Sequence, residues 1–220
     1  MLWVVLSKTL RRILLVDSNF NFLEIYDNLL SKEDCNQLIS DFNKISPMSG
    51  RLNYSNGNDA KKLGTTLYCD FNEDLFSDYN DYIMGTLYKG LPKYLEKYSF
   101  VKTGVDVWKC SRYYNIQKYK EGEGYFTIHC EQDCAKFSSR MLVWMIYLND
   151  AECGTEFPYQ DTIVDAKQGR LVLWPAAWTH PHKGVTPNKG LKYIVTGWYT
   201  YLDETTTPLP SVSRVYERKT

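Results

Sequence analysis

The chain has three histidines, and the residues around them are of types that bind metal ions. His129 in the stretch GYFTIHCEQDC lies two residues before Glu131, and His180 and His182 lie together in WTHPHKG. Residues i and i+2 of a strand point to the same face, so His129 and Glu131 could offer an imidazole and a carboxylate to one ion. Two histidines and one carboxylate are the ligand set of many non-haem iron(II) sites. The third ligand would then be His180 or His182.

The His-x-Glu pair is weak evidence when it is taken alone. With 26 acidic residues in 220, chance places an acid at this spacing after one of three histidines in roughly one chain in three. The pair could equally be a histidine whose hydrogen bond a neighbour satisfies. Two further residues favour a metal site. Lys192, ten residues after His182, could pair with a carboxylate at the far end of a ligand held by the ion. Tyr119 could donate its hydroxyl to the same carboxylate.

The second half of the chain predicts a β-rich body that would hold these residues rigidly. From Val105 the apolar pattern alternates, and about eight short strand-like runs follow at close spacing. These runs are VDVWKCSRYYNIQKYK, YFTIHCE, RMLVWMIYLND, TEFPYQ, DTIVDA, GRLVLWPA, THPHKGV and KYIVTGWYTY. They favour a mainly β fold with flanking helices, in which N-terminal helices pack outside a jelly-roll core, that is, a cupin-like double-stranded β-helix.

The first half predicts helices and loops. Ser31 is the expected N-cap of a helix in LSKEDCNQLISDFNK, and DLFSDYNDYIMGTLYKGLPKYLEKY predicts a second helix, interrupted near Gly90 to Pro92. Between them, MSGRLNYSNGNDAKKLG is rich in Gly, Asn and Ser and predicts a loop. The apolar opening MLWVVLSKTLRRILLV, broken by three basic residues, is expected to be a packed strand or helix, too short to span a bilayer.

We expect one compact domain in three parts: a helical and loop region over residues 1–104, the β core over 105–203 and a polar tail over 204–220. Net charge is +0 and the pI is about 6.8, which argues against a dedicated nucleic-acid binder. The six cysteines form no CxxC pair, so a structural zinc site is not expected. We expect reduced thiols, no membrane span and a cytoplasmic location. The sequence does not indicate an oligomeric state.

An ordered set of motifs resembles a known family. The runs YKEGEGYFTIHCE, RMLVWMIYLND, TEF, GRLVLWPA and HKGVTPNKGLKYIVTGW are similar to the catalytic domain of Fe(II)/2-oxoglutarate-dependent dioxygenases. The resemblance covers about Val105 to Tyr201 and is strongest to the prolyl 4-hydroxylase branch, especially its small microbial and viral members. IYDNLLSKEDCNQLISDF is a weaker echo of the helical segment that precedes the domain in that branch. A viral chain would act in the host cell's cytoplasm.

The resemblance implies a role for each matching residue. The branch places its lysine ten residues after the second histidine ligand, which favours His182 over His180 as ligand. His129, Glu131 and His182 match the iron ligands, and Lys192 matches the residue that pairs with the C5 carboxylate of 2-oxoglutarate. The remaining matches are Tyr119, Thr196 and Tyr147 for the cosubstrate pocket, and Trp198, Tyr125 and His180 for the substrate side.

The implied activity is hydroxylation of a peptidyl substrate, most naturally proline, with release of succinate and CO2. The implied cofactors are Fe(II), 2-oxoglutarate and O2, with ascorbate as a reductant. Three alternatives stay open: the same chemistry on another residue or a small metabolite, a non-catalytic jelly-roll binding module, and a zinc protein that uses Cys130 and Cys134. Cys130 is expected on the strand face opposite His129, which argues against zinc.

The chain departs from the branch in two places. Glu131 stands where the branch usually has aspartate, which puts the detailed coordination in doubt. ECGTEF lacks one glycine of the usual turn, so substrate contacts in that loop cannot be carried over. By analogy with the branch, LNYSNGNDAKKLGTTLY is expected to be a flexible loop that closes over the substrate, although a solvated connection would explain its composition as well.

Overall fold

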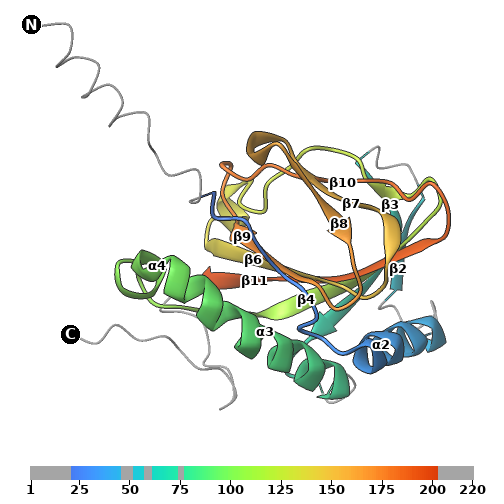
Figure 1. The fold of residues 1–220 in the computed structure, drawn as a ribbon, viewed down its shortest axis with the longest axis horizontal. Coiled ribbons are helices and arrows are strands. Elements are labelled where there is room, and N and C mark those ends of the chain that lie inside the picture. The colour runs from blue at the N-terminus through green and yellow to red at the C-terminus, as the bar shows by residue number, and fades with distance from the viewer. Residues whose placement is uncertain (1–20, 46–51, 57–60, 74–76, 203–220) are drawn as a thin grey trace, which may run out of the picture.

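The computed structural model describes residues 21–45, 52–56, 61–73 and 77–202, whose strands form two antiparallel sheets that face each other (Figure 1). The larger sheet has the order β1-β9-β6-β11-β4-β3-β2, with β5 paired to β3, and the smaller has the order β10-β7-β8. The larger contains β1 (Glu24–Tyr26), β2 (Leu52–Asn56), β3 (Lys62–Asp70), β4 (Trp108–Lys120), β5 (Gly124–Tyr125), β6 (Arg140–Tyr147), β9 (Leu171–Pro175) and β11 (Leu191–Tyr201). The smaller contains β7 (Ala151–Phe157), β8 (Thr162–Ala166) and β10 (Lys183–Gly184).

The helices cover the outer face of the larger sheet, away from the smaller one (Figure 1). They are α2 (Lys32–Lys44), α3 (Ser77–Lys97) and the short α4 (Ser99–Thr103), and two 3-10 turns lie at Ala135–Phe137 and Pro158–Gln160. The predicted N-cap is confirmed, because the Ser31 hydroxyl accepts a hydrogen bond of 3.0 Å from the backbone N–H of Asp34.

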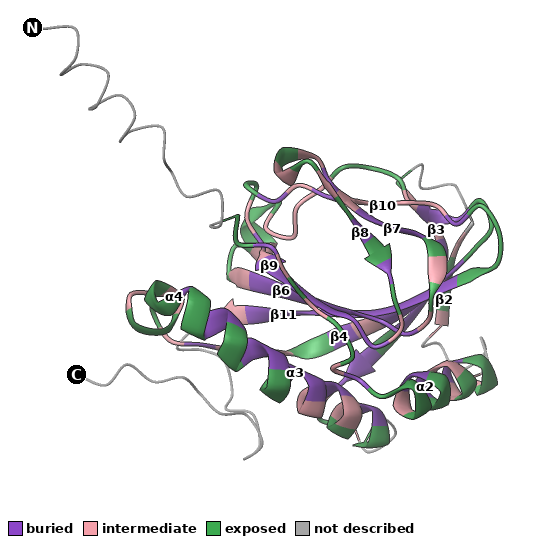
Figure 2. Cartoon of the chain, in the orientation of Figure 1, coloured by how far each residue is buried: buried purple, intermediate pink, exposed green. Residues whose placement is uncertain are grey.

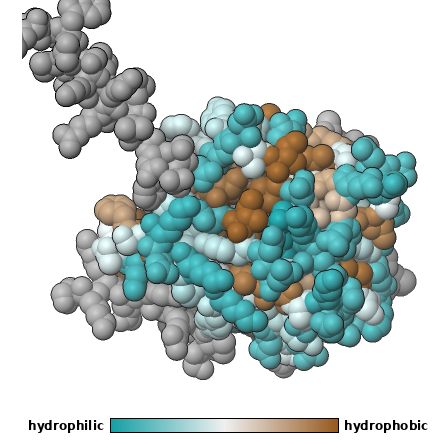
Figure 3. Space-filling view, viewed as in Figure 1, coloured by the Kyte–Doolittle hydropathy of each residue, from teal (hydrophilic) through white to brown (hydrophobic). Residues whose placement is uncertain are grey.

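Alternation along the central strands separates two apolar cores. On β6, Leu142 and Trp144 pack toward the helices, whereas Val143 and Met145 pack into the space between the sheets. Buried residues of α2 and α3 lie on the sides that face the sheet (Figure 2). On the face seen in Figure 3, apolar side chains gather near the middle and polar ones surround them. The expected mainly β fold with helices packed outside is therefore confirmed.

The prediction of a loop over MSGRLNYSNGNDAKKLG is wrong for the residues that the structure describes. Residues 52–56 and 62–70 form β2 and β3, which pair with each other. β3 also pairs with β4 from Thr65 to Asp70, so long-range hydrogen bonds outweigh the local preference of Gly and Asn for turns. The region before residue 105 thus adds β1, β2 and β3 to the main sheet, besides its helices. Residues 46–51 and 57–60 lie outside the described part.

The predicted break in the second helix is also wrong, because α3 continues through Pro92. Pro92 has no N–H to donate within the helix, and it lies on the exposed side of α3. The expected packed N-terminal segment and the polar tail fall outside the described residues. None of the helices in the described ranges is both long and apolar enough to cross a membrane.

Candidate metal centre and cosubstrate pocket

Two chain segments are joined at the centre of the site. The backbone N–H of His129 donates to the carbonyl of His182 at 3.0 Å, and the N–H of His182 donates to the carbonyl of His129 at 2.8 Å. This isolated bridge is the extent of regular pairing there, so the predicted strand YFTIHCE is wrong beyond its first residue. The backbone N–H of Glu131 instead donates to Ala176, at the end of β9. Hydrogen bonds to two neighbouring segments therefore replace the expected strand.

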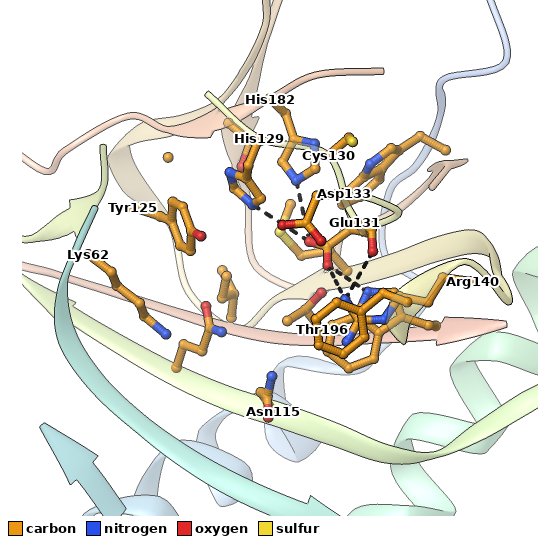
Figure 4. Close-up of a pocket in the computed structure, with 18 of the residues that line it drawn as sticks. Lys62, Asn115, Tyr125, His129, Cys130, Glu131, Asp133, Arg140, His182 and Thr196 are labelled. Atoms are coloured by element: carbon orange, nitrogen blue, oxygen red, sulfur yellow. Dashed lines mark hydrogen bonds and ion pairs between the residues drawn. The ribbon is translucent and has the colours of Figure 1, made fainter. Parts of the chain in front are cut away.

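His129, Glu131 and His182 point toward one another, with one ligand atom of each lying within 4.8 Å of the others (Figure 4). The Oε1 atom of Glu131 is 3.7 Å from Nε2 of His129 and 3.6 Å from Nε2 of His182. Adjacent ligands of an octahedral ion bonded at about 2.1 Å lie about 3 Å apart, so small side-chain shifts would close the site on an ion.

Backbone carbonyls set the orientation of both imidazoles. The Nδ1 atom of His129 lies 3.0 Å from the carbonyl of Thr127, and Nδ1 of His182 lies 3.0 Å from the carbonyl of His180. A carbonyl can only accept, so Nδ1 donates in each ring and Nε2 is the atom that faces Glu131. Metal-binding histidines are commonly oriented in this way. The donor set and its support therefore fit an Fe(II) ion.

The second carboxylate oxygen of Glu131 accepts hydrogen bonds from other side chains of the protein. The Oε2 atom accepts a hydrogen bond of 2.9 Å from Nε1 of Trp198 and another of 2.9 Å from Nη1 of Arg140. The Arg140 guanidinium lies 3.7 Å from the ring centre of Trp198 and 4.0 Å from that of Phe137. Burial raises the pKa of the Glu131 carboxyl, but His129 and His182 outweigh this and hold the pKa well below its usual range.

The triad opens onto a cavity of about 260 Å³ between the two sheets. In Figure 4, Lys62 and Tyr125 lie on one side of this cavity and Arg140 lies on the other. The cavity is lined by His129, Cys130, Glu131, Asp133, His182, Lys62, Asn115, Gln117, Tyr119, Tyr125, Phe137, Arg140, Met145, Thr155, Trp174, Gly184, Lys192, Ile194, Thr196 and Trp198.

Lys192 lies at the closed end of the cavity. Only 2% of the residue is exposed, and Nζ donates to the carbonyls of Val185 at 2.9 Å and Gly154 at 3.2 Å. Its ammonium is also 5.1 Å from the ring centre of Tyr119, whose hydroxyl donates to Gln117 at 2.6 Å. Burial lowers the pKa of Lys192, and the interaction with Cys153 offsets only part of this shift. A carboxylate that entered here would gain a charge-assisted hydrogen bond.

The other predicted site residues divide between the cavity and its surroundings. Thr196 and Trp198 line the cavity, and Tyr125 does too, stacked on His129 with ring centres 3.9 Å apart. Tyr147 is not among the lining residues: its hydroxyl bonds Thr155 and the carbonyl of Val164, and Thr155 lines the wall.

His180, predicted at the substrate side, is not among the residues that line the cavity. Its Nδ1 lies 3.0 Å from the Thr179 hydroxyl, and its Nε2 lies 2.7 Å from the carbonyl of Asn21. It lines a separate depression formed partly by Asn21 and Tyr94. Both ring nitrogens are held by neighbours, which turns the imidazole away from the triad.

Several cavity residues were not predicted. Asn115 and Gln117 lie on the same face of β4 as Tyr119, so strand alternation could have found them. Arg140 reaches Glu131 from the start of β6, where no local pattern marks it. Lys62 lies in the stretch that was read as a loop, and its place on the cavity wall depends on the pairing of β3 with β4.

The thiols do not complete the metal site. Cys130 lines the cavity, contrary to the expected opposite face, because the segment is not a regular strand; Cys134 is exposed. Across the described residues, His129, Glu131 and His182 are the one cluster of three or more potential ligands. The zinc alternative therefore has no further ligand in that part of the chain.

Comparisons with known proteins agree with this geometry. Residues 114–200 match the model of the 2OG-Fe(II) oxygenase superfamily. No curated protein sequence matches the chain significantly. Among solved structures, the chain is similar to a Pseudomonas putida prolyl-4-hydroxylase, with 16% identity, a TM-score of 0.63, and coverage of 85% of this chain and 96% of that one.

Two further structures share the fold. The viral collagen prolyl hydroxylase of Paramecium Bursaria Chlorella virus-1, in its 2OG complex, gives 17% identity and a TM-score of 0.59 over 84% of this chain and 99% of that one. A Trichoplax adhaerens prolyl hydroxylase, in complex with a hypoxia inducible factor peptide fragment, gives 18% identity and a TM-score of 0.56 over 90% and 92%.

Fold, triad and family match together define a non-haem iron oxygenase. Residues 114–200 match the 2OG-Fe(II) oxygenase superfamily, and with the triad and the prolyl 4-hydroxylase-like fold this match identifies a 2-oxoglutarate-dependent dioxygenase. The superfamily implies Fe(II), 2-oxoglutarate and O2 as the reaction partners.

Proposed function

We propose that this enzyme hydroxylates a proline residue of a peptide or protein substrate. The observation that carries the proposal is the convergence of His129, Glu131 and His182 on a cavity whose closed end holds the Lys192 ammonium. Bound Fe(II) supplies the oxidative chemistry by which 2-oxoglutarate and O2 become succinate and CO2 while the substrate gains one hydroxyl group.

The chain's own residues bind and orient the reactants. Lys192 pairs with the C5 carboxylate of 2-oxoglutarate, and Tyr119 and Thr196 flank that carboxylate from β4 and β11. Both strands belong to the rigid sheet, so the cosubstrate is held in one orientation while the surrounding core excludes water. Glu131 keeps one oxygen for the ion because Arg140 and Trp198 hold the other.

The surface beside the cavity supports a peptide substrate. Tyr68 and Tyr113 are 53% and 58% exposed, and strand alternation puts them on the same sheet face as Asn115, which lines the cavity. Exposed aromatic rings of this kind suit extended proline-containing segments. Trp108 and Tyr114, two other aromatic residues of β4, lie in the core.

The first test is binding of 2-oxoglutarate to anaerobic protein loaded with Mn(II). Lys192→Met should weaken binding by about tenfold or more, because it removes a charge-assisted hydrogen bond. Lys189→Met is the matched control, since this lysine is 74% exposed at its side chain, and it should bind normally. Metal-independent binding, or equal affinities for the two variants, would reject the assigned cosubstrate site.

The second test is a screen of proline-containing peptides. Succinate release and a mass gain of one oxygen on proline are the expected results, and addition of ascorbate should prolong turnover. Oxidation of another residue, or of a small metabolite alone, would replace the proline assignment by the corresponding substrate. We also propose a reducing, cytoplasmic location, in keeping with six cysteines that form no disulfide.

A further inference from the structure

Lys62 places a second ammonium group in the cavity. It extends from β3 on the side opposite Glu131 and Arg140 (Figure 4), and it is half-buried. We propose that Lys62 binds a carboxylate of the substrate, so that the preferred peptide carries an acidic residue next to the hydroxylated one. The inference rests on the proposed function, since it specifies the substrate of the same site.

The contacts of Lys62 leave its charge unmatched. Nζ donates to the Thr66 hydroxyl at 2.6 Å and lies 5.9 Å from the ring centre of Tyr119. No carboxylate of the described residues lies within ion-pair distance of it. Burial lowers the pKa of Lys62 to about 8, and the negative charge of Glu131 offsets only part of this shift. A partly buried ammonium with one hydroxyl partner has two donors to offer a ligand.

The cosubstrate does not account for this second cation. 2-Oxoglutarate must reach from the metal ligands to Lys192, which is fully buried at the closed end. Lys62 is half-buried, whereas Lys192 is buried, and Lys62 extends into the cavity from the side opposite Glu131 and Arg140 (Figure 4). Of the two lysines, Lys62 is therefore the one that a substrate entering from the open side can reach.

The charge balance of the cavity supports the same assignment. The described lining residues include three cationic side chains, Lys62, Lys192 and Arg140, and two acidic ones, Glu131 and Asp133. A divalent ion adds two positive charges and doubly ionised 2-oxoglutarate removes two, so the loaded site keeps one positive charge in excess. Arg140 interacts with both acids, and Lys192 receives the cosubstrate. The unmatched cation is thus Lys62.

The test compares proline peptides in pairs, in which one peptide has glutamate and its partner has glutamine next to the proline. One pair carries this residue before the proline and a second pair carries it after. Wild type should process a glutamate peptide with a kcat/KM about tenfold or more above its glutamine partner. Lys62→Met should remove this preference by slowing the glutamate peptide alone, and Lys62→Arg should keep it. Lys61→Met, one residue away and exposed, is the matched control and should behave as wild type.

Affinity for 2-oxoglutarate separates the outcomes. It should change less than about twofold in Lys62→Met; a loss as large as that of Lys192→Met would assign Lys62 to the cosubstrate and overturn the inference. An unchanged preference for glutamate in Lys62→Met would overturn it as well.

If wild type oxidises neither peptide, the proline assignment fails and Lys62 is tested with small probes. Binding of N-acetylglutamate and N-acetylglutamine to the Mn(II)- and 2-oxoglutarate-loaded protein would then be compared. Selective binding of the acid that Lys62→Met removes supports the carboxylate subsite, and equal binding of the two probes rejects it.

Discussion

The two carboxylate oxygens of Glu131 have different tasks. Oε1 faces the two imidazoles, whereas Oε2 accepts hydrogen bonds from Arg140 and Trp198. Both contacts of Oε2 depend on the reach of the glutamate side chain, which is one methylene longer than the aspartate usual in this family branch. The pair Arg140 and Trp198 therefore gives a physical reason why glutamate can serve as the ligand here.

This arrangement predicts a specific coupling between residues. Trp198→Phe removes the N–H donor but keeps a ring over Arg140, and it should weaken Mn(II) binding by about 10–100-fold, the usual effect of losing a partner that orients a ligand. Glu131→Asp should cause a loss of similar size. In the double variant the losses should not add, because the shorter aspartate no longer reaches Trp198.

Free Mn(II), measured by electron paramagnetic resonance, gives the dissociation constants for this cycle. Trp178→Phe is the control, since Trp178 is 74% exposed and should not affect the metal. Fully additive losses in the double variant would show that Trp198 does not act through the carboxylate.

Lys62 predicts a pH dependence of substrate choice. Burial lowers its pKa to about 8, so the side chain is charged below this pH and neutral above it. Of the groups around it, Tyr119 has a pKa raised by burial and Glu131 has one that is lowered, so neither changes charge in this range. The kcat/KM preference for glutamate over glutamine peptides should therefore fall as the pH rises through about 8. In Lys62→Arg the preference should persist to higher pH, and an identical profile in both proteins would exclude Lys62 as its source.

Residue type and spacing predicted His129 and Glu131 as candidate ligands and left His180 and His182 open, and the family resemblance selected His182. His129, Glu131 and His182 do converge, and Lys192 does lie in the same cavity. Their roles as ligands and cosubstrate anchor remain predictions for the experiments above. Lys62 and Arg140 could not be predicted, because each enters the cavity through tertiary contacts of a strand whose own sequence does not mark it.

At the scale of elements, α3 supports the sheet that carries the site. Gly90 lies against β9, where a Cβ atom would come within 2.2 Å of Leu171 Cδ2, whereas a Cβ at Gly85 of the same helix would meet nothing within 4 Å. Gly90→Ala should destabilise the fold by about 1–3 kcal/mol through overpacking. Gly85→Ala should stabilise it by up to about 1 kcal/mol through helix propensity.

Urea unfolding monitored by circular dichroism would measure both variants. Because the two changes are chemically identical, the difference between them isolates the contact with β9. Equal effects would mean that Leu171 moves aside without cost.

Most of the strands could be predicted from alternation, because β4, β6 and β11 have one face toward the helices and the other toward the second sheet. β2 and β3 could not, since Gly and Asn dominate their local signal and the stabilising partner, β4, lies far along the chain. At Pro92 the local sequence predicts a helix break that the structure lacks. Packing of the surrounding α3 residues on the sheet keeps the helix continuous.

For the whole molecule, metal binding should appear as stability. An ion at 100 times its dissociation constant stabilises the folded state by about 2.7 kcal/mol. For a domain of this size, that should raise the melting temperature by about 5–10 °C. Differential scanning fluorimetry with and without Mn(II) would measure the shift, and a chelator should reverse it.

Variants assign the shift to particular ligands. His182→Ala should abolish the metal-induced rise in melting temperature. His180→Ala should retain this rise but lower the melting temperature of the metal-free protein, because His180 is buried and hydrogen-bonded to Asn21. The reverse pattern would mean that His180, and not His182, holds the ion.

The reciprocal backbone hydrogen bonds between His129 and His182 also allow opening of the site to be measured. Each of these two amide hydrogens is held by the other ligand's carbonyl, outside any continuous ladder. Their exchange with deuterated solvent therefore measures the free energy of separating the two segments, independently of global unfolding. If metal binding holds the two segments together, the amide hydrogens of His129 and His182 should exchange quickly without metal and slowly with it. Hydrogen exchange at these two positions would then report whether the metal centre is assembled.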